Sequence, residues 1–306
     1  MKYRLFAERG LRVSVVGLGT WQFGGEWGQD YTQTEVDAVV DACRETGINL
    51  IDTAECYGDG VSERLVGKAV AKDRDSWFLA TKFGHRYRGL GLRDQLWSPE
   101  DVRIQLENSL RNLGTDRIDL YQFHSGDNEF FDNDELWAML VLQAEAGKIG
   151  MIGVSLTSRA DIRDRQAPLA AGVGAEAVQV VYNRLDRGAE DTVLPICAEN
   201  GLGVLARVPL ASGFLTGKYG VGTVFPDGDY RAGLDKEKLD GMAREAAAIR
   251  KTEVPPGTPM AAWAIAWCLR HEAVACVIPG ARNPEQLRAN AAAADMADSG
   301  HPLAAD

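Results

Sequence analysis

Four side chains able to give, take or hold a proton each follow a short apolar stretch of the sequence. Asp52 comes directly after the largely apolar residues 48–51, Lys82 ends the segment WFLATK, and His124 ends the segment IDLYQFH. Tyr57 follows Asp52 by five residues. Short apolar runs of this kind are typical of buried strands, so each polar side chain sits where a strand emerges. An acid, a phenol, an amine and an imidazole in this placement indicate proton-transfer chemistry.

The phenol is the group whose chemistry depends most on the other three. With a reference pKa of about 10 it is a poor proton donor at neutral pH, and an ammonium within a few ångströms lowers that pKa. We therefore expect Lys82 and Asp52 to lower the pKa of Tyr57, and His124 to orient a carbonyl group. Such a tuned acid contributes on the order of 10²–10⁴ in rate. The alternative is a structural Asp52–Lys82 ion pair beside a packed histidine and tyrosine.

Strand-like and helix-like segments alternate along the chain after an N-terminal β-hairpin, expected at Tyr3–Phe6 and Leu11–Ser14. Helices of ten to fifteen residues between strands indicate parallel pairing with helical crossovers. The expected strands are residues 15–18, 49–52, 77–81, 118–122, 149–154, 178–181, 204–206 and 276–278. The expected helices are residues 34–46, 62–71, 99–112, 134–146, 159–169, 191–200, 239–251, 260–271 and 284–294.

Eight consecutive strand–helix units without a linker favour a closed (β/α)8 TIM barrel over an open doubly wound sheet, which is the alternative. We expect one such domain over residues 1–306. In these barrels the functional residues lie at the carboxyl ends of the strands. Three long connections, residues 85–98, 125–133 and 211–241, fall at that end, and we expect them to be loops that cover substrate and cofactor.

Composition narrows the class of protein. A net charge of −11 argues against a nucleic-acid surface, which needs clustered Lys and Arg. The five cysteines are odd in number, widely spaced and form no CxxC pair, which favours free thiols in a reducing cytosol over disulfides or a zinc site. The other histidines (His85, His271 and His301) do not have the spacing of metal ligands. We expect no metal site. The N-terminus lacks a signal-peptide core and the longest apolar stretch, residues 260–269, is too short for a bilayer, so we expect a cytoplasmic protein without membrane partners.

Long sequence blocks, spread over essentially the whole chain, resemble the aldo-keto reductases. They include GINLIDTAECYG (47–58), ATKFG (80–84), SLRNLGTDRIDLYQFH (109–124), GKIGMIGVS (147–155), PLASGFLTGKY (209–219) and IPGARNPEQLRAN (278–290). Blocks of this length in this order make the resemblance specific. It implies a (β/α)8 barrel and a nicotinamide cofactor, usually NADP(H). It places the catalytic tetrad on Asp52, Tyr57, Lys82 and His124, with Tyr57 as the general acid.

The resemblance also assigns the cofactor site. Ser155 and Gln179 hold the nicotinamide carboxamide, the loop 212–218 covers the pyrophosphate, and Arg282 meets the adenosine 2′-phosphate. The full set of expected cofactor contacts is Gly19, Thr20, Trp21, Asp52, Ser155, Gln179, Arg207, Pro209, Leu210, Ser212, Gly213, Leu215, Gly217, Lys218, Gly280, Arg282, Gln286 and Asn290.

The residues themselves support an anion at the far end of this site. The pair Asn283-Pro284 opens the last expected helix, whose free amides and dipole favour an anion nearby. Arg282 directly before it offers a bidentate fork suited to a phosphate monoester. A solvated arginine before a helix is the alternative interpretation.

Two positions depart from the pattern of many family members. Leu156 stands where an asparagine hydrogen-bonds the carboxamide, and Arg207 stands where an aromatic ring lies under the nicotinamide. A guanidinium can stack on a flat ring, but it adds positive charge beside a nicotinamide that is cationic when oxidised. We expect Arg207 to alter cofactor affinity or the preference between redox states.

Substrate contacts are expected from Trp21, Tyr57 and His124. Further aromatic residues on the presumed mouth loops could line an apolar pocket or fill the core instead: Trp27, Tyr87, Trp97, Phe130 and Phe131.

The sequence thus predicts an NADPH-dependent reductase of an aldehyde or ketone, sugar-derived ones included, which is a small-molecule substrate. Two alternatives stay open. One is a cofactor-binding regulatory or partner subunit with little turnover, and the other is a sugar or polyol dehydrogenase working mainly in the oxidative direction. The carbonyl compound and the oligomeric state are left open.

Overall fold

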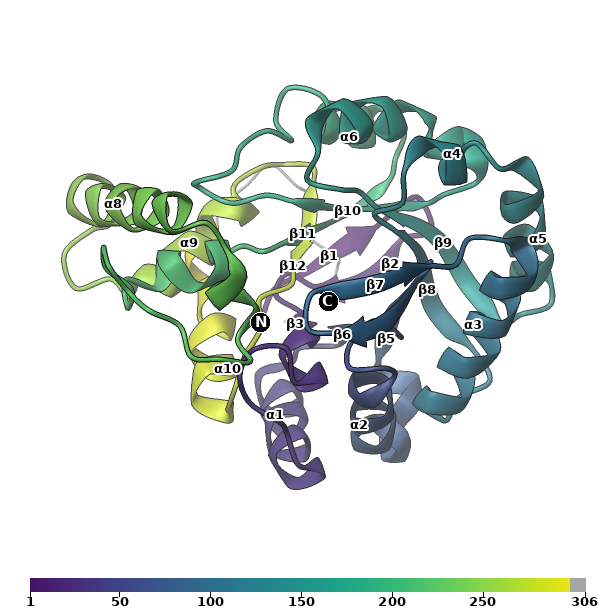
Figure 1. Cartoon of the computed structure of the whole chain (residues 1–306), viewed down its shortest axis with the longest axis horizontal. Coiled ribbons are helices and arrows are strands. Elements are labelled where there is room, and N and C mark those ends of the chain that lie inside the picture. Colours follow the sequence, from purple (N-terminus) through teal and green to yellow (C-terminus); the bar gives the residue numbers. More distant parts are fainter. Residues whose placement is uncertain (298–306) are drawn as a thin grey trace.

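Eight parallel strands form one sheet in the computed structural model, which describes residues 1–297. The strand order β12-β11-β10-β9-β8-β5-β4-β3 follows the chain, as expected for consecutive strand–helix units (Figure 1). The strands are β3 (Leu18–Gly19), β4 (Leu50–Asp52), β5 (Phe78–Phe83), β8 (Ile118–His124), β9 (Ile149–Ser155), β10 (Ala177–Val181), β11 (Gly203–Arg207) and β12 (Val274–Val277).

The sheet closes on itself where the first and last strands meet. Val16 forms a parallel bridge with Val277, and the amide of Gly17 donates to the carbonyl of Val277 at 2.8 Å. The amide of Gly19 donates to the carbonyl of Pro279 at 3.0 Å. A side chain at Gly19 would lie 2.8 Å from a backbone oxygen, so glycine permits this close approach. The predicted (β/α)8 barrel is therefore confirmed, although its first strand is shorter than expected.

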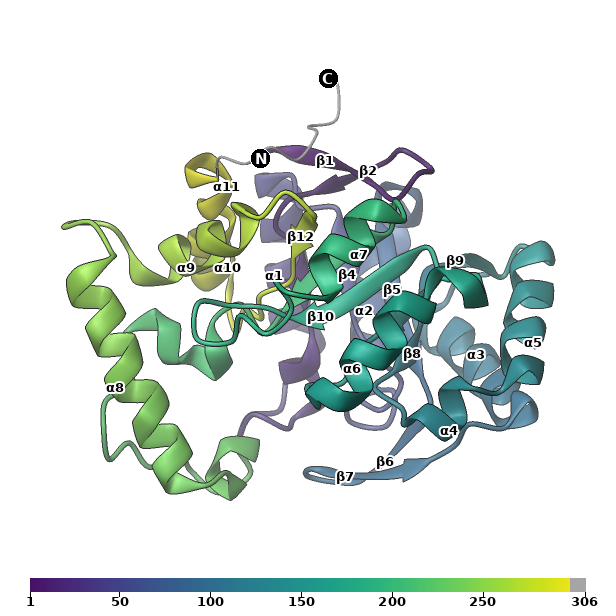
Figure 2. The same cartoon turned by 90° about the horizontal axis from the view of Figure 1, so that it is seen from above.

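Helices surround the barrel, and the long helix α8 lies away from it at one side in both views (Figures 1 and 2). The helices are α1 (Gln33–Thr46), α2 (Val61–Val70), α3 (Pro99–Leu113), α4 (Asn128–Phe131), α5 (Asp134–Glu145), α6 (Ala160–Gln166), α7 (Val193–Glu199), α8 (Lys236–Thr252), α9 (Met260–Leu269), α10 (Pro284–Ala291) and α11 (Ala293–Met296).

Local sequence signals set the ends of several helices. Thr32 and Glu35 form a capping box at the start of α1, and Gly47 ends that helix in the left-handed region at φ 78°. Ser98 caps α3 by accepting from the amide of Asp101. The Ala-rich segment after α10 is a packing element, since its alanines at 291, 293, 294 and 297 are buried.

The N-terminal hairpin closes the barrel end opposite the predicted active site. Strands β1 (Tyr3–Phe6) and β2 (Leu11–Ser14) form the expected antiparallel hairpin, with Tyr3 opposite Ser14 and Phe6 opposite Leu11. Phe6 and Val13 pack with inward-facing residues such as Leu50 and Leu120. Figure 2 shows the hairpin at one end of the barrel and strands β6 and β7 at the other.

The three long connections contain more regular structure than the sequence indicates, so their description as plain loops is wrong. Residues 85–98 form an antiparallel hairpin, β6 (His85–Gly89) and β7 (Leu92–Gln95), whose turn uses Gly89 and Gly91 at positive φ. Residues 125–133 contain α4. Residues 211–241 contain two 3₁₀ helices, η5 (Ala211–Thr216) and η6 (Tyr230–Gly233), and the start of α8.

All five cysteines are buried and free. No helix within residues 1–297 is long and apolar enough to cross a membrane. The same residues hold no cluster of three or more His, Cys, Asp or Glu side chains arranged for a metal ion, and His301 lies outside them.

Candidate active site

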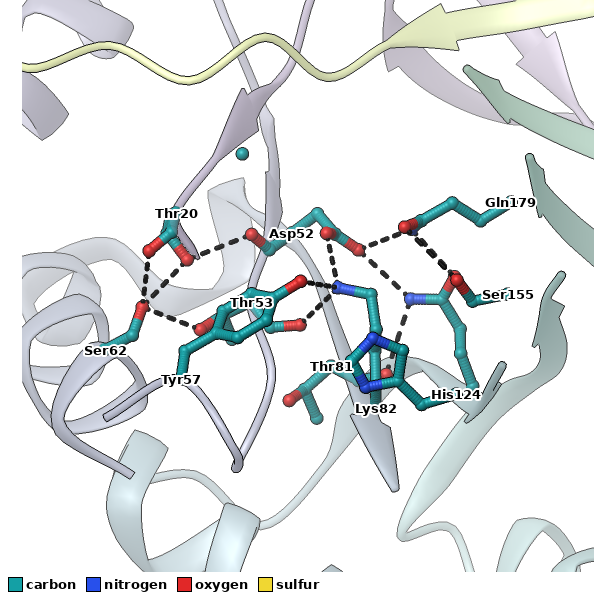
Figure 3. A network of polar contacts seen from close by, with 12 residues as sticks. Thr20, Asp52, Thr53, Tyr57, Ser62, Thr81, Lys82, His124, Ser155 and Gln179 are labelled. Atoms are coloured by element: carbon teal, nitrogen blue, oxygen red, sulfur yellow. Dashed lines mark hydrogen bonds and ion pairs between the residues drawn. The ribbon is translucent and has the colours of Figure 1, made fainter. Parts of the chain in front are cut away.

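The Lys82 ammonium is the centre of the polar cluster at the carboxyl ends of β4, β5 and β8. Its Nζ donates to Asp52 Oδ1 at 2.5 Å, to the Thr53 carbonyl at 2.7 Å and to the Tyr57 hydroxyl at 3.2 Å (Figure 3). Lys82 and Asp52 are only 1% and 3% exposed. An ammonium with three donors thus has three partners, and one of them is the phenol.

Sheet register brings these side chains together. Asp52 pairs with Ala80 across β4 and β5, and Lys82 pairs with Gln122 across β5 and β8. Because these strands are neighbours and parallel, residues at their ends project into the same region. Residues from three separated sequence segments therefore meet, as predicted.

The second oxygen of Asp52 is held by two amides. Oδ2 accepts from Gln179 Nε2 at 2.7 Å and from Gln122 Nε2 at 3.1 Å. Gln179 in turn accepts from the Ser155 hydroxyl at 3.5 Å. These bonds satisfy a buried carboxylate and fix the position of the lysine that it pairs with. Gln122 was not singled out in the sequence; its position within a strand, two residues before His124, is the available signal.

Tyr57 is positioned by its loop. Gly58 follows it at φ 63°, and a side chain there would lie 2.5 Å from the carbonyl oxygen of Gly24. The Ser62 hydroxyl contacts the hydroxyls of Thr20 and Thr53, each at 2.9 Å. The loop that carries Tyr57 is thereby packed against the first loop of the barrel. The Tyr57 hydroxyl is directed at Lys82 (Figure 3).

The expected direction of the Tyr57 pKa is wrong for the protein described here. Burial raises the pKa of Tyr57 above its usual value, and the charge of Asp52 raises it further. The charge of Lys82 lowers this pKa but offsets only part of the effect of burial. Burial opposes the charge of Lys82 as well, but Asp52 and Tyr57 leave the pKa of Lys82 raised. At neutral pH the site therefore holds a protonated phenol beside a charged lysine.

His124 lies near the phenol of Tyr57. Its ring centre is 6.1 Å from that of Tyr57 and 5.1 Å from that of His85. Burial, and then the charges of His85 and Lys82, hold the pKa of His124 well below its usual range. Its imidazole is neutral at neutral pH and can donate one hydrogen bond without carrying charge.

A cavity of about 570 Å³ opens from Asp52 and Tyr57 and runs to α10. Most of the expected cofactor contacts line it: Gly19, Thr20, Trp21, Asp52, Gln179, Arg207, Pro209, Leu210, Ser212, Gly213, Lys218, Gly280, Arg282, Gln286 and Asn290. Ser155, Leu215 and Gly217 do not. The Ser155 hydroxyl donates to Gln179 instead. Leu215, in η5, is packed in a hydrophobic cluster, and Gly217 ends η5.

The segment 212–231 covers the cavity and is attached to the first loop. The amide of Gly28 donates to the carbonyl of Gly228 at 3.1 Å, and the amide of Tyr230 donates to the carbonyl of Glu26 at 3.0 Å. The Ser212 and Tyr230 hydroxyls contact each other at 2.5 Å. Several lining residues were not singled out for this site in the sequence: Gln22, Val208, Tyr219, Tyr230, Arg231, Arg250 and Met260. The sequence around them has no pattern that indicates which side chains face the cavity.

The far end of the cavity is cationic and fits the phosphates of a dinucleotide. Lys218, Arg231, Arg250 and Arg282 all line it. Asn283 caps α10 by accepting from the amide of Gln286 at 2.9 Å, and the Arg282 amide donates to the Gln286 side chain. Arg282 is 38% exposed, so its guanidinium is accessible from the cavity.

The two departures from the family pattern contact each other. Arg207 Nη2 donates to the carbonyl of Leu156 at 3.0 Å, and the buried Arg207 Nε has no partner among the described residues. The Leu156 side chain is fully buried in the core. Burial lowers the pKa of Arg207, an effect that the charges of Tyr57 and Asp52 partly offset. The guanidinium thus brings a positive charge to the cavity close to the proton-transfer cluster.

The aromatic candidates divide into two groups. Trp21 and Trp27 line the cavity and meet edge to face with ring centres 5.3 Å apart. Trp97 and Phe131 are core residues, 4% and 1% exposed, so of the two alternatives they take the core-filling one. Phe130 stacks on Trp97, and neither Phe130 nor Tyr87 lines the cavity.

Comparison with known proteins agrees with this geometry. The model of the "Aldo/keto reductase family" matches residues 15–299. The chain belongs to this family. Its members are oxidoreductases with nicotinamide cofactors, and the cavity has the cationic and polar residues for such a group.

Relatives in the aldo/keto reductase family match over nearly their whole length. The chain is 34% identical to the aldo-keto reductase YhdN of Bacillus subtilis, covering 94% of this chain and 87% of the relative. It is 33% identical to the NADH-specific methylglyoxal reductase of Escherichia coli, over 94% and 91%. Among solved structures, the aldo-keto reductase AKR11C1 of Bacillus halodurans in its holo form matches with a TM-score of 0.79, at 29% identity over 99% and 92%. The glycerol dehydrogenase AKR11B4 of Gluconobacter oxydans has a TM-score of 0.74, at 31% identity over 95% and 89%.

Proposed function

We propose that this protein is an NADP(H)-dependent reductase of aldehydes or ketones in which Tyr57 gives the proton. The observation that carries the proposal is the Tyr57 hydroxyl at 3.2 Å from Lys82 Nζ, on the wall of the cavity. A bound reduced nicotinamide supplies the hydride. The cation at the phenol, the buried acid behind it and the neutral imidazole beside it are the parts that carbonyl reduction requires.

Charge balance explains how the residues act. As hydride reaches the carbonyl carbon, negative charge develops on the carbonyl oxygen, and the Tyr57 proton neutralises it. The phenolate left behind is stabilised by Lys82, whose charge is in turn fixed by Asp52. His124 is neutral, so it orients the carbonyl as a hydrogen-bond donor and does not compete as an acid.

The cofactor would be held along the cavity by the lining residues from Gln179 to Asn290. Lys218 and Arg282 supply positive charge, and Gly213 at φ 96° lets the backbone of the covering segment approach closely. Arg282 beside the start of α10 supports the phosphorylated cofactor. One relative is described as NADH-specific, so the choice between NADPH and NADH needs a test. Measuring the affinities of the wild type and of Arg282→Ala for both cofactors tests the part that Arg282 plays in it.

The decisive test compares the wild type with Tyr57→Phe. The variant removes one oxygen and keeps the ring, so we expect NADPH binding within about twofold of the wild type and loss of carbonyl reduction by a factor of about 10² or more. NADPH fluorescence measures binding, and nicotinamide absorbance with a panel of aldehydes measures turnover. Retained turnover in Tyr57→Phe would refute the role of the phenol.

The same assays separate the alternatives. Tight NADPH binding without turnover on a broad aldehyde panel would favour a cofactor-binding subunit over an enzyme. A relative named as a glycerol dehydrogenase makes the oxidative direction the second candidate. Comparing initial rates of aldehyde reduction and polyol oxidation at one pH decides between the two directions.

A further inference from the structure

The thiol of Cys56 contacts the histidine of the proposed tetrad. Cys56 Sγ lies 3.7 Å from His124 Nδ1, within hydrogen-bonding distance for sulfur. Cys56 is 3% exposed and directly precedes Tyr57, so one turn of loop presents the phenol and the thiol to the same site. His124 Nδ1 has this one hydrogen-bonding partner within residues 1–297.

Two charged side chains near the thiol favour one direction for its hydrogen bond, with the thiol as the donor. The positive charge of Arg93 on β7 acts on the Cys56 sulfur. The same guanidinium is paired with Glu26, which is 1% exposed and also accepts from Trp21 Nε1 at 2.9 Å. The positive charge of Arg93 therefore directs the hydrogen of the thiol away from itself, and that hydrogen is available to His124 Nδ1.

The protonation states agree with this direction. Burial raises the pKa of Cys56 to about 11, so the sulfur carries its hydrogen at neutral pH. His124 is neutral there, and a neutral imidazole has one donor and one acceptor nitrogen. With the thiol donating, Nδ1 is the acceptor and the proton resides on Nε2.

We propose that Cys56, through its contact with His124 Nδ1, is a positioning residue that sets the tautomer of His124 and so leaves Nε2–H to donate to the substrate oxygen. The role rests on the proposed carbonyl reduction for its catalytic meaning. The tautomer itself is a property of the protein without substrate and can be measured independently of any activity.

The first test reads the tautomer by ¹⁵N NMR of histidine-labelled protein at neutral pH. The His124 signals are assigned by their absence in His124→Asn. We expect the wild type to carry its proton on Nε2, Cys56→Ser to keep it there because a hydroxyl also donates, and Cys56→Ala to show a substantial Nδ1–H population. Cys43→Ala, another fully buried cysteine but on α1, is the matched control and should leave the His124 signals unchanged.

The second test measures kinetics on the same variants. We expect kcat for carbonyl reduction to fall about three- to tenfold in Cys56→Ala, the range for one lost hydrogen bond, with NADPH affinity unchanged and recovery in Cys56→Ser. A wild-type proton on Nδ1 would overturn the proposal, and so would an Nε2–H tautomer that survives in Cys56→Ala. A tautomer shift without a fall in kcat would remove the catalytic role. If no carbonyl reduction is found in the wild type, the proposed function fails while the NMR comparison still decides the part played by Cys56.

Discussion

The Lys82 ammonium lies 3.2 Å from the Tyr57 hydroxyl while its other two bonds go to Asp52 and the Thr53 carbonyl. It is therefore held in place before any ligand binds. Because it is buried, its charge acts on the phenol through a medium that screens it weakly. The proposed acid and the group that would stabilise its conjugate base are therefore already in contact.

Replacing Lys82 by Met removes that stabilisation. We expect kcat for carbonyl reduction to fall by about 10² or more, because the phenolate then forms without a cation beside it. Stopped-flow reduction assays measure the loss. The exposed Lys68→Met is the control for removing a lysine charge, and a Lys82→Met enzyme with wild-type kcat would contradict the mechanism.

The Tyr57 pKa predicts the alkaline limit of activity. Reduction needs the protonated phenol, and burial raises its pKa above 10, so the rate should stay level through neutral pH and decline only as pH rises above about 10. In Lys82→Met the residual activity should decline at still higher pH, since the charge of Lys82 lowers the Tyr57 pKa. A pH profile of kcat for both proteins tests the two statements. A decline centred near neutral pH would show that another group is the acid.

Arg207 should disfavour the oxidised cofactor. Its guanidinium lines the cavity close to Tyr57 and Asp52 and has no acidic partner among the described residues. Changing Arg207 to Tyr removes a positive charge near the nicotinamide site, so the affinity for NADP⁺ should rise a few-fold relative to that for NADPH, about 1 kcal/mol. Fluorescence and calorimetric titrations with both redox forms measure the ratio. Equal ratios in the wild type and the variant would count against this interpretation.

Removing one partner of the buried Glu26–Arg93 ion pair should destabilise the fold more than removing both partners. Glu26 and Arg93 side chains are 1% and 17% exposed, and the pair connects the first loop to β7. Arg93→Met leaves a buried carboxylate without its cation, so the free energy of unfolding should fall by about 3–5 kcal/mol. Urea unfolding measures this, and the double variant Glu26→Gln/Arg93→Met should be more stable than Arg93→Met alone. Equal losses in the single and double variants would argue against a coupled pair.

Glu55 should make the protein less stable as pH rises through the weakly acidic range. Burial raises the pKa of Glu55 to about 7, although the amide of Asn108 opposes this with a hydrogen bond. Between its unfolded pKa of about 4.3 and 7, the folded protein keeps a proton that the unfolded chain has lost, so the free energy of unfolding falls with increasing pH. Because Glu55 is partly exposed, we expect the effect to be on the order of 2 kcal/mol.

Unfolding curves at pH 5 and pH 8 test the Glu55 prediction. Glu55→Gln should remove this part of the pH dependence, while the exposed Glu135→Gln should retain it. A pH dependence that is identical in the wild type and Glu55→Gln would assign the effect to other groups.

The repeating part of the fold, and the meeting of Asp52, Lys82 and His124 near Tyr57, could be predicted from the sequence. Parallel strands buried on both sides leave apolar runs, as in β5, where all six residues are buried. Asp52 and His124 end their strands and Lys82 is one residue before the end of β5, so the polar residues that follow these runs could be assigned to strand ends. The parallel register then requires them to meet.

Features that depend on contacts between loops could not be predicted in this way. The β6–β7 hairpin has polar and exposed residues in both strands, so it has no apolar alternation to reveal it. The predicted direction of the Tyr57 pKa shift was wrong, because that shift follows from the competition between burial and the charge of Lys82. A sequence does not show how deeply a single atom is buried. Trp97 and Phe131 were candidates for the pocket because their connections were treated as loops, whereas they pack against the barrel.

The seam between residues 16–19 and 277–280 has a consequence for synthesis of the chain. A nascent polypeptide that lacks β12 has two open edges, one at β3 and one at β11, and open edges are templates for pairing with other chains. The barrel can become edge-free only after β12 has been made. Aggregation of chains that lack β12, more than of the closed barrel, is therefore the hazard that this topology creates.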